Sequence, residues 1–268
     1  MSSSGIDEVG AGEYVSPPRK EPYAKLVYLL RRKPGLSLEE FQEHWFCRHA
    51  AFGRSHPAVL RYVQYHALAN DPIREALPQA GDGSDTKSYD GMAVAWFDSV
   101  AAMRAAMTSQ AVAAALEDER HFIDHNRSVA VLTDEHVVVE PSGDAPIVLV
   151  ECLRRIAGID RRTFSERWLG HGAIGREAHS RGLLQGYIQN HAIAEDDARV
   201  AEIEELGSTG ENWDGVVTAY FHSLAIAKEL FADPLASEKS YEDEKTFIDH
   251  SQNLYFLARR RPIKDLVR

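Results

Sequence analysis

The chain repeats itself, and the repeat constrains the fold more than any other feature of the sequence. Four landmarks recur in one order at separations of 123 to 125 residues, and these are Trp45 with Trp168, Tyr62–His66 with Tyr187–His191, Tyr89–Gly91 with Trp213–Gly215, and Phe122–His125 with Phe247–His250. Such self-similarity indicates duplication of one folding unit. The 268 residues suffice for two units that each bury a core. We expect these units at residues 23–140 and 146–265, after a polar, disordered tail at 1–22.

Each unit reads as strand, helix, strand, strand, helix, strand. The first unit predicts strands at 25–32, 60–69, 91–97 and 128–139, with helices at 38–54 and 100–116. The second predicts strands at 147–154, 184–194, 215–221 and 252–260, with helices at 160–180 and 223–247. Ser37 and Glu40 form a capping-box pattern, and Pro234 should break the last helix. This order predicts an α+β fold of two ferredoxin-like units, each a four-stranded antiparallel sheet with both helices on one face.

The second face of each sheet needs a cover, because an exposed apolar sheet face is unfavourable. Two such sheets in one chain can pack face to face or close into a barrel. Alternation along the strands groups the polar side chains on one face, namely Tyr28, Tyr62, Gln64 and His66 in the first unit and Glu151, Tyr187, Gln189 and His191 in the second. The opposite face, with Val27 and Val150, is apolar enough to pack on helices. We therefore expect the polar face to line a largely apolar cavity between the sheets.

A histidine on the apolar stripe of each first helix completes the candidate site. Phe41, Trp45 and His49 share one helix face, and His171 is the counterpart of His49. A histidine can take up or release a proton near neutral pH, a tyrosine hydroxyl can donate one, and a buried carboxyl can do either. The candidate catalytic residues are His49, Tyr62, His66, His171, Tyr187, His191 and Glu151. The candidate substrate-binding residues are Tyr28, Gln64, Trp96, Gln189 and Tyr220.

Structural interpretations of these residues stay open. A core histidine bonded to a carbonyl explains His49 and His171 equally well, since it avoids the roughly 1–3 kcal/mol cost of an unsatisfied buried group. The tyrosines and glutamines also fit a structural network between the sheets, and His66 and His191 fit solvated strand ends. His125 fits a helix end, where a cation meets the negative dipole. The long segments at 70–88 and 195–212 fit either binding loops or solvated insertions.

Composition excludes several classes of function. The net charge is -11, so the positive surface that nucleic acid requires is not expected. No apolar run approaches the roughly 20 residues that span a bilayer, and the N-terminus lacks a signal peptide's apolar core. Only Cys47 and Cys152 occur, which suggests neither disulfides nor a zinc site. A cytoplasmic protein without metal or membrane contact is therefore expected.

The motifs of both units resemble the EthD family. The first unit carries K-L-V-Y-L-L-R-R-K-P-G-L-S-x-E-E-F-x-x-H-W-x-x-x-H and then R-Y-V-Q-Y-H-A-L. The second carries R-R-x-A-G-I-D-x-x-x-F-x-x-x-W-x-x-H-G and then G-Y-I-Q-N-H-A-I, which has one residue fewer before its histidine. The resemblance covers nearly all of both units. It implies the dimeric α/β-barrel superfamily, with the tandem chain forming a pseudo-dimer that could pair further as a homodimer.

The resemblance also implies a range of activities on small hydrophobic molecules, commonly without a cofactor. In isomerase-like relatives the helix histidine and the following strand tyrosine belong to the site, which are His49 and Tyr62 here, and His171 and Tyr187 in the second unit. The hypothesis is a cofactor-independent lyase of the dehydratase type that acts on an aromatic or polyketide-like substrate by His/Tyr acid–base catalysis. The alternatives are an isomerase, cyclase or decarboxylase, a ligand-binding accessory protein to an oxygenase, and a cofactor-free or haem-dependent monooxygenase. Either pocket could be the active one.

Overall fold

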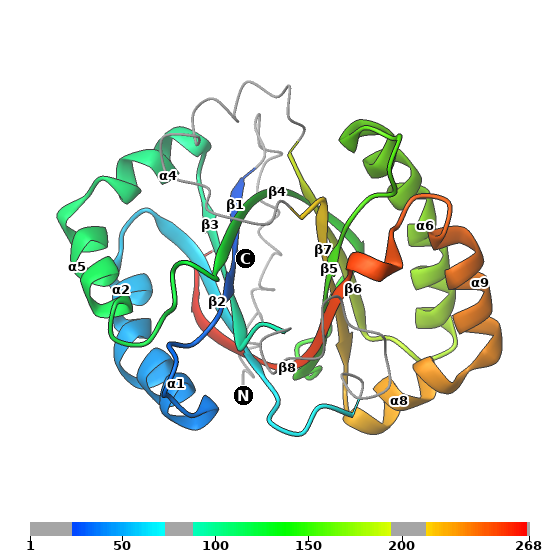
Figure 1. Ribbon diagram of the computed structural model, residues 1–268, viewed down its shortest axis with the longest axis horizontal. Helices are drawn as coiled ribbons and strands as arrows, with labels where there is room; N and C mark the ends of the chain where they lie inside the picture. The colour runs from blue at the N-terminus through cyan, green and yellow to red at the C-terminus, as the bar shows by residue number, and fades with distance from the viewer. Residues whose placement is uncertain (1–22, 73–87, 194–212, 267–268) are drawn as a thin grey trace, which may run out of the picture.

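Eight antiparallel strands from the two repeats close into one barrel, as the computed structural model shows (Figure 1). The structure describes residues 23–72, 88–193 and 213–266, so the tail expected at 1–22 and most of both long loops lie outside the described residues. The strands of the first repeat are β1 (Ala24–Leu30), β2 (Val59–Ala67), β3 (Gly91–Phe97) and β4 (Val129–Val139). Those of the second are β5 (Ile147–Leu153), β6 (Gly186–Ala192), β7 (Gly215–Phe221) and β8 (Leu254–Asp265).

The strand order β1-β3-β2-β8-β5-β7-β6-β4 contains two ferredoxin-like sheets. Within the first repeat, β1 lies between β3 and β4, and β2 pairs with β3; the second repeat has the same arrangement. The repeats are joined edge to edge at two seams, where β2 pairs with β8 and β4 pairs with β6. The α+β fold and the closed intrachain barrel implied by the resemblance are confirmed.

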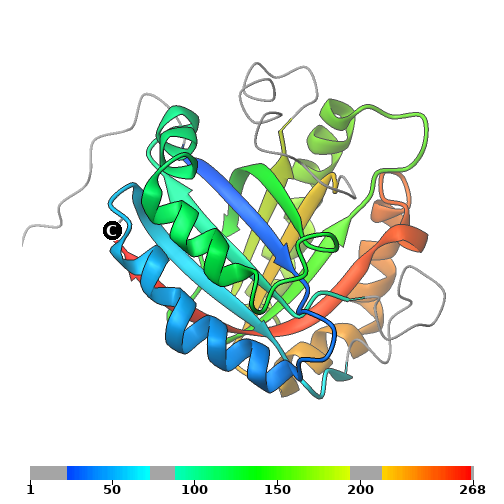
Figure 2. The same cartoon turned by 60° about the vertical axis from the view of Figure 1, so that its left-hand side comes forward.

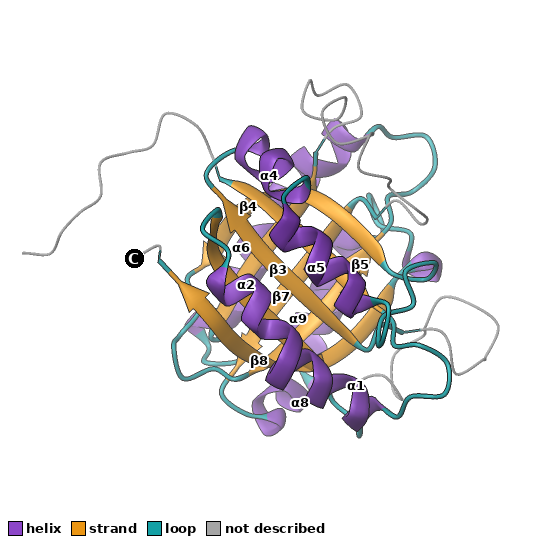
Figure 3. Ribbon diagram, turned by 90° about the vertical axis from the view of Figure 1, so that its left-hand side faces the viewer, coloured by secondary structure: helices purple, strands orange, loops and turns teal. Residues whose placement is uncertain are grey.

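The helices lie outside the barrel, in two groups on opposite sides (Figures 1 and 3). The first group comprises α1 (Leu38–His44), the π-helical turn η1 (Trp45–His49), α2 (Ala50–Ser55), α4 (Val100–Met107) and α5 (Gln110–Glu119). The second comprises α6 (Arg161–Ser180), α8 (Leu224–Ala232), α9 (Pro234–Glu244) and the 3-10 turn η3 (His250–Gln252). Seen from the side in Figure 2, α1, α2 and α5 cover the strands of the first repeat. None of the described helices has the length and apolar character to cross a membrane.

Local sequence signals set the helix ends. The capping box of Ser37 and Glu40 is present at the start of α1, and Pro234 begins α9 after the N-cap Asp233. The single helix expected over 100–116 is wrong, because it divides into α4 and α5. Ser109 accepts a hydrogen bond from the backbone N–H of Val112 and so caps a new helix where the first one ends.

The assignment of the two sheet faces from alternation is also wrong. Val27 and Val150, expected under the helices, belong to one apolar cluster in the barrel interior with Val63, Val94 and Phe256. The polar face instead lies under the helices, where Trp45 packs on it and hydrogen bonds to it. Both faces are buried, so alternation alone could not decide which of them faces inward. Polar side chains fit beneath the helices because the helices bring donors and acceptors to them.

Candidate active site

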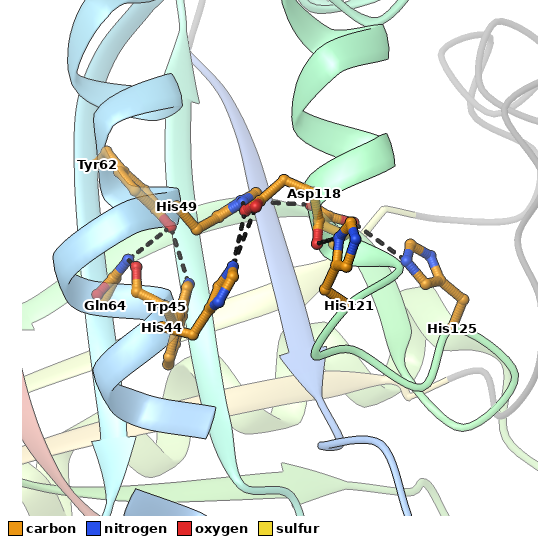
Figure 4. Close-up of polar contacts among 9 residues, drawn as sticks. His44, Trp45, His49, Tyr62, Gln64, Asp118, His121 and His125 are labelled. Carbon is orange, nitrogen blue, oxygen red and sulfur yellow. Dashed lines mark hydrogen bonds and ion pairs between the residues drawn. The ribbon is translucent and has the colours of Figure 1, made fainter. Parts of the chain in front are cut away.

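A chain of hydrogen bonds positions a tyrosine between sheet and helix in the first repeat (Figure 4). Nε1 of Trp45 donates to the hydroxyl oxygen of Tyr62 over 3.2 Å, and Nε2 of Gln64 donates to it over 3.0 Å. The ring of His66 stacks on Trp45, and its Nε2 lies 2.9 Å from Oε1 of Gln64. Because two donors already reach its oxygen, the Tyr62 hydroxyl keeps its own proton to donate.

The second repeat builds the same chain from the counterpart residues. Nε1 of Trp168 donates to the hydroxyl oxygen of Tyr187 over 3.3 Å, and Nε2 of Gln189 donates to the backbone oxygen of Trp168 over 2.7 Å. His191 stacks on Trp168 and lies 3.1 Å from Oε1 of Gln189. In both repeats the glutamine and the strand histidine therefore support the tyrosine from behind.

A buried histidine of each repeat is held by neighbouring carboxylates. Nδ1 of His49 lies 2.9 Å from Oδ2 of Asp118, and its Nε2 lies 3.6 Å from Oε1 of Glu119. His125 approaches the other oxygen of Glu119 at 3.5 Å. The second repeat has the same contacts at 2.8, 3.3 and 3.5 Å, between His171 and Asp243, His171 and Glu244, and His250 and Glu244.

The π-helical turn η1 explains how the two histidines reach equivalent places. The sequence from Trp45 to His49 is one residue longer than that from Trp168 to His171. A π-helical turn holds one more residue than an α-helical turn, so η1 absorbs the insertion within the helix. The α6 helix lacks the insertion and is α-helical throughout.

Burial and neighbouring charges shift the pKa values of the acid–base groups in the first repeat. Burial lowers the pKa of His49 and outweighs the hydrogen bond that its Nδ1 donates to Asp118, which raises this pKa. Burial and the charge of Asp118 raise the pKa of Glu119 to about 7. Burial opposes ionisation of Asp118, but the hydrogen bonds from His49 and His44 outweigh it and lower the pKa of this carboxyl. At neutral pH the site therefore combines the mainly neutral imidazole of His49, the carboxylate of Asp118 and the carboxyl of Glu119, which exchanges its proton.

The second repeat is tuned differently. Burial would lower the pKa of His171, but the hydrogen bonds and charges of Glu244 and Asp243 outweigh it and raise the pKa. Burial would raise the pKa of Glu244, but the imidazole of His171 outweighs it and lowers the pKa. Burial raises the pKa of Glu151 to about 8. The second repeat thus favours the charged form of His171 beside Glu244, and Glu151 stays mainly uncharged at neutral pH.

The first repeat encloses a cavity of about 430 Å³ between its helices and its sheet. Its walls are mainly apolar and come from all four strands of the first repeat and from η1, α2, α4 and α5. The polar groups that line it include Tyr28, His49, Tyr62, Glu119 and His125. A volume of this size and character is typical of small-molecule sites.

The equivalent cavity of the second repeat measures only about 150 Å³. The difference arises where the second repeat has a larger side chain than the first. At three such positions, Val217 replaces Ala93, Leu230 replaces Ala106 and Tyr255 replaces Ala130. The strand register shows two of these equivalences directly, because Tyr28 pairs with Ala93 and Ala130 while Glu151 pairs with Val217 and Tyr255. Larger side chains therefore fill the second site.

The structure brings some of the sequence candidates together and separates others. Tyr28, His49 and Tyr62 line the first cavity, and Glu151, His171 and Tyr187 line the second. Gln64, His66, Gln189 and His191 lie behind the tyrosines and are buried, so a solvated position for the strand histidines is wrong. Trp96 and Tyr220 lie in the barrel interior, away from both cavities, where the hydroxyl of Tyr220 contacts that of Tyr65 over 2.8 Å.

Sequence reasoning missed the carboxylates. Asp118 and Glu119 recur as Asp243 and Glu244 within the longer repeated pattern E-D-E-x-x-F-I-D-H. Only its last four residues were used as a landmark. Within the described residues, no group of three or more histidine, cysteine or acidic side chains is arranged to hold a metal ion.

Gly53 gives a test of the tyrosine's support. A Cβ atom at Gly53 would lie 2.5 Å from Cδ1 of Tyr62, whereas a Cβ at Gly170 on α6 meets nothing within 4 Å. We expect Gly53→Ala to lower the free energy of unfolding by about 1–3 kcal/mol through overpacking. The control Gly170→Ala should leave it unchanged or raise it by up to about 1 kcal/mol. Equal unfolding midpoints in urea for the two variants would contradict this packing.

Comparison with protein families places both repeats in one family. The model of the EthD domain matches residues 33–126 and again residues 156–251. Comparison with curated proteins gave no match.

Solved structures with the same barrel cover nearly the whole chain. An anthrone oxidase-like protein matches with a TM-score of 0.61 at 7% identity, over 92% of this chain and 96% of that one. A provisionally assigned monooxygenase from Lactobacillus acidophilus NCFM matches with a TM-score of 0.54 at 9% identity, over 92% and 97%. An EthD family protein from Bacillus halodurans C-125 is 20% identical and corresponds to 42% of this chain and 99% of its own, with a TM-score of 0.32. The likeness to the anthrone oxidase-like protein and to the monooxygenase, at 7% and 9% identity, establishes the fold alone.

Proposed function

The chain belongs to the EthD domain family, and from this premise we propose that its first repeat is a general acid–base enzyme that oxidises a small aromatic substrate with molecular oxygen. The observation that carries the proposal is the buried imidazole of His49 at a mainly apolar cavity, with its Nδ1 anchored by Asp118. Because the carboxylate of Asp118 accepts the proton on Nδ1, Nε2 of His49 is left unprotonated and can act as the base. A carboxylate orients the histidine of a catalytic triad in the same way.

The substrate must carry a proton that an imidazole can remove. A methylene group flanked by aromatic rings and activated by a conjugated carbonyl satisfies this need, because the carbanion is delocalised. The mainly apolar walls favour such a ring system. The anthrone oxidase-like protein and the monooxygenase share only the fold, but their names make anthrone the first compound to test.

The proposed reaction converts the methylene and one O₂ into a carbonyl and one water. His49 removes the first proton, and the carbanion adds to O₂ after passing one electron to it, which gives a peroxide anion. Glu119, with a pKa raised by burial to about 7, can protonate this anion. The Glu119 carboxylate then takes the second methylene proton, and the O–O bond breaks. The carbonyl keeps one oxygen atom, and the departing hydroxide takes the proton held by His49 and becomes water.

The test separates proton abstraction from oxidation. In D₂O without oxygen, the protein should accelerate exchange of the anthrone methylene protons above the buffer rate, as followed by NMR. With ¹⁸O₂ it should consume oxygen and place one labelled atom in the product. Absence of both effects for anthrone and hydroxylated anthrones would contradict the proposal. A visible absorption band on the purified protein would instead indicate a haem-dependent reaction.

A dehydratase is the second candidate, and Glu119 is the observation that favours it. A carboxyl with a pKa near 7 can protonate a departing hydroxyl group while His49 removes a proton from the adjacent carbon. Isomerisation or cyclisation would use the same groups. This candidate predicts loss of water from a hydroxylated polyketide-like compound without any uptake of oxygen.

A further inference from the structure

A second histidine shares the carboxylate that holds His49. Nε2 of His44 on α1 lies 3.0 Å from Oδ1 and 3.2 Å from Oδ2 of Asp118. Nδ1 of His49 reaches the same carboxylate at 2.9 Å, so one carboxylate serves two imidazoles (Figure 4). His44 stands in the repeated motif of the first unit, directly before Trp45, but the proposed reaction gives it no role.

The second repeat lacks this arrangement. Arg167 stands at the position of His44, one residue before Trp168, and its Nη1 donates to the backbone oxygen of Thr246 over 2.6 Å. The Asp243 carboxylate contacts His171 over 2.8 Å, as Asp118 contacts His49. The chain therefore contains the same dyad with and without a competing imidazole.

We propose that His44 is a positioning residue that keeps His49 in its neutral, proton-accepting form by competing with it for the carboxylate of Asp118. The effect of His44 on catalysis rests on the proposed function. The competition itself depends only on the side chains of His44, His49 and Asp118.

Burial distinguishes the two imidazoles. The side chain of His44 is 21% exposed and that of His49 is 9% exposed, so a charge on His49 costs more desolvation. A positive charge on His44 would neutralise Asp118, and a charge on His49 would then gain little from the carboxylate. The pKa directions agree with this competition, since the pKa of His49 is lowered, first by burial and in part by His44, whereas that of His171 is raised.

Other titratable groups near His49 do not provide the same competition. Glu119 on α5 faces its Nε2 at 3.6 Å and favours the imidazolium when ionised. His125 contacts Glu119 rather than Asp118. Nδ1 of His121 lies 3.1 Å from the backbone oxygen of Asp118, where it does not engage the carboxylate. Among the described groups, His44 is therefore the one to substitute.

The test is an NMR titration of the histidine ring nitrogens in the full-length protein. His44→Gln keeps a hydrogen-bond donor but removes the competing charge, so the pKa of His49 should rise by about one unit, equivalent to a tenfold change in its protonation equilibrium. His121→Gln is the matched control, since it removes a neighbouring imidazole that does not contact the carboxylate. A shift no larger in His44→Gln than in His121→Gln would overturn the proposal.

The reciprocal variant tests the same idea in the other repeat. Arg167→His should place an imidazole beside Asp243 and lower the pKa of His171, while an unchanged or raised value would count against the competition. The Arg167→His variant therefore tests the competition even if His44→Gln fails to fold.

Activity gives an independent reading. The acid limb of the pH–rate profile should move to higher pH in His44→Gln, with the rate at high pH unchanged. If the titration shows the expected shifts while the rate profile does not move, the competition stands and the role of His49 as the base fails.

Discussion

His49→Gln lowers turnover of the first repeat's substrate by about 10²–10⁴-fold, the usual contribution of a general base. Glutamine keeps a polar side chain of similar reach but cannot take up a proton at neutral pH. The measurement is the rate of methylene proton exchange and of oxygen uptake, with circular dichroism to establish that the variant is folded.

His171→Gln is the matched control, because His171 has the equivalent contacts beside the smaller cavity. We expect turnover per folded molecule to stay near the wild-type rate. The free energy of unfolding should fall by about 1–3 kcal/mol, since the buried Glu244 loses its partner. A reversed outcome, with activity lost only in His171→Gln, would assign the chemistry to the second repeat.

Ala130→Tyr is expected to close the first cavity and abolish substrate binding. The substitution copies Tyr255, which stands at the equivalent position of the second repeat, where the cavity has about 150 Å³ instead of about 430 Å³. Because the phenol ring occupies space that the substrate needs, affinity should fall by at least about 10²-fold. Ligand titration by fluorescence or calorimetry measures this loss.

The fold should tolerate Ala130→Tyr, since the antiparallel register already accepts a tyrosine at the equivalent place in β8. We expect at most about 1–3 kcal/mol of destabilisation from crowding. Ala130→Ser, which adds a single oxygen atom, is the control and should bind almost normally. Retention of full affinity in Ala130→Tyr would show that substrate binds elsewhere.

Periodicity and repetition were sufficient to predict the two ferredoxin-like units, whereas the closed barrel was implied by the resemblance to the EthD family. The order of strands and helices followed from alternation, from capping residues such as Ser37 and from breakers such as Pro234. The duplication at near-constant spacing predicted that two sheets would cover each other. These signals are local or repeated, so they survive in a single sequence.

The site could be predicted only in part. His49, Tyr62 and Tyr28 follow from their place on a helix stripe and on alternating strand positions, and all three line the first cavity. Trp96 and Tyr220 were also expected at the site, but Trp96 pairs with Lys25 and Tyr220 with Val148, so both side chains lie on the opposite sheet face, inside the barrel. Asp118 comes from another helix and meets His49 only through tertiary packing.

The size of the cavity could not be predicted from the sequence either, because it depends on which alanine residues become neighbours in the folded sheet. Ala93 and Ala130 become neighbours only because both pair with Tyr28 in the folded sheet. No spacing along the chain shows this.

The two seams at β2–β8 and β4–β6 have a consequence for how the sites can differ. A barrel made from two identical chains would show every substitution twice, so a side chain that plugged one chamber would plug its twin. Here both halves belong to one chain, so the two cavities can change independently. Large side chains can fill the cavity of one repeat and stabilise the fold, while the cavity of the other repeat stays large enough for a ligand. A barrel assembled from two copies of one chain could not have this asymmetry.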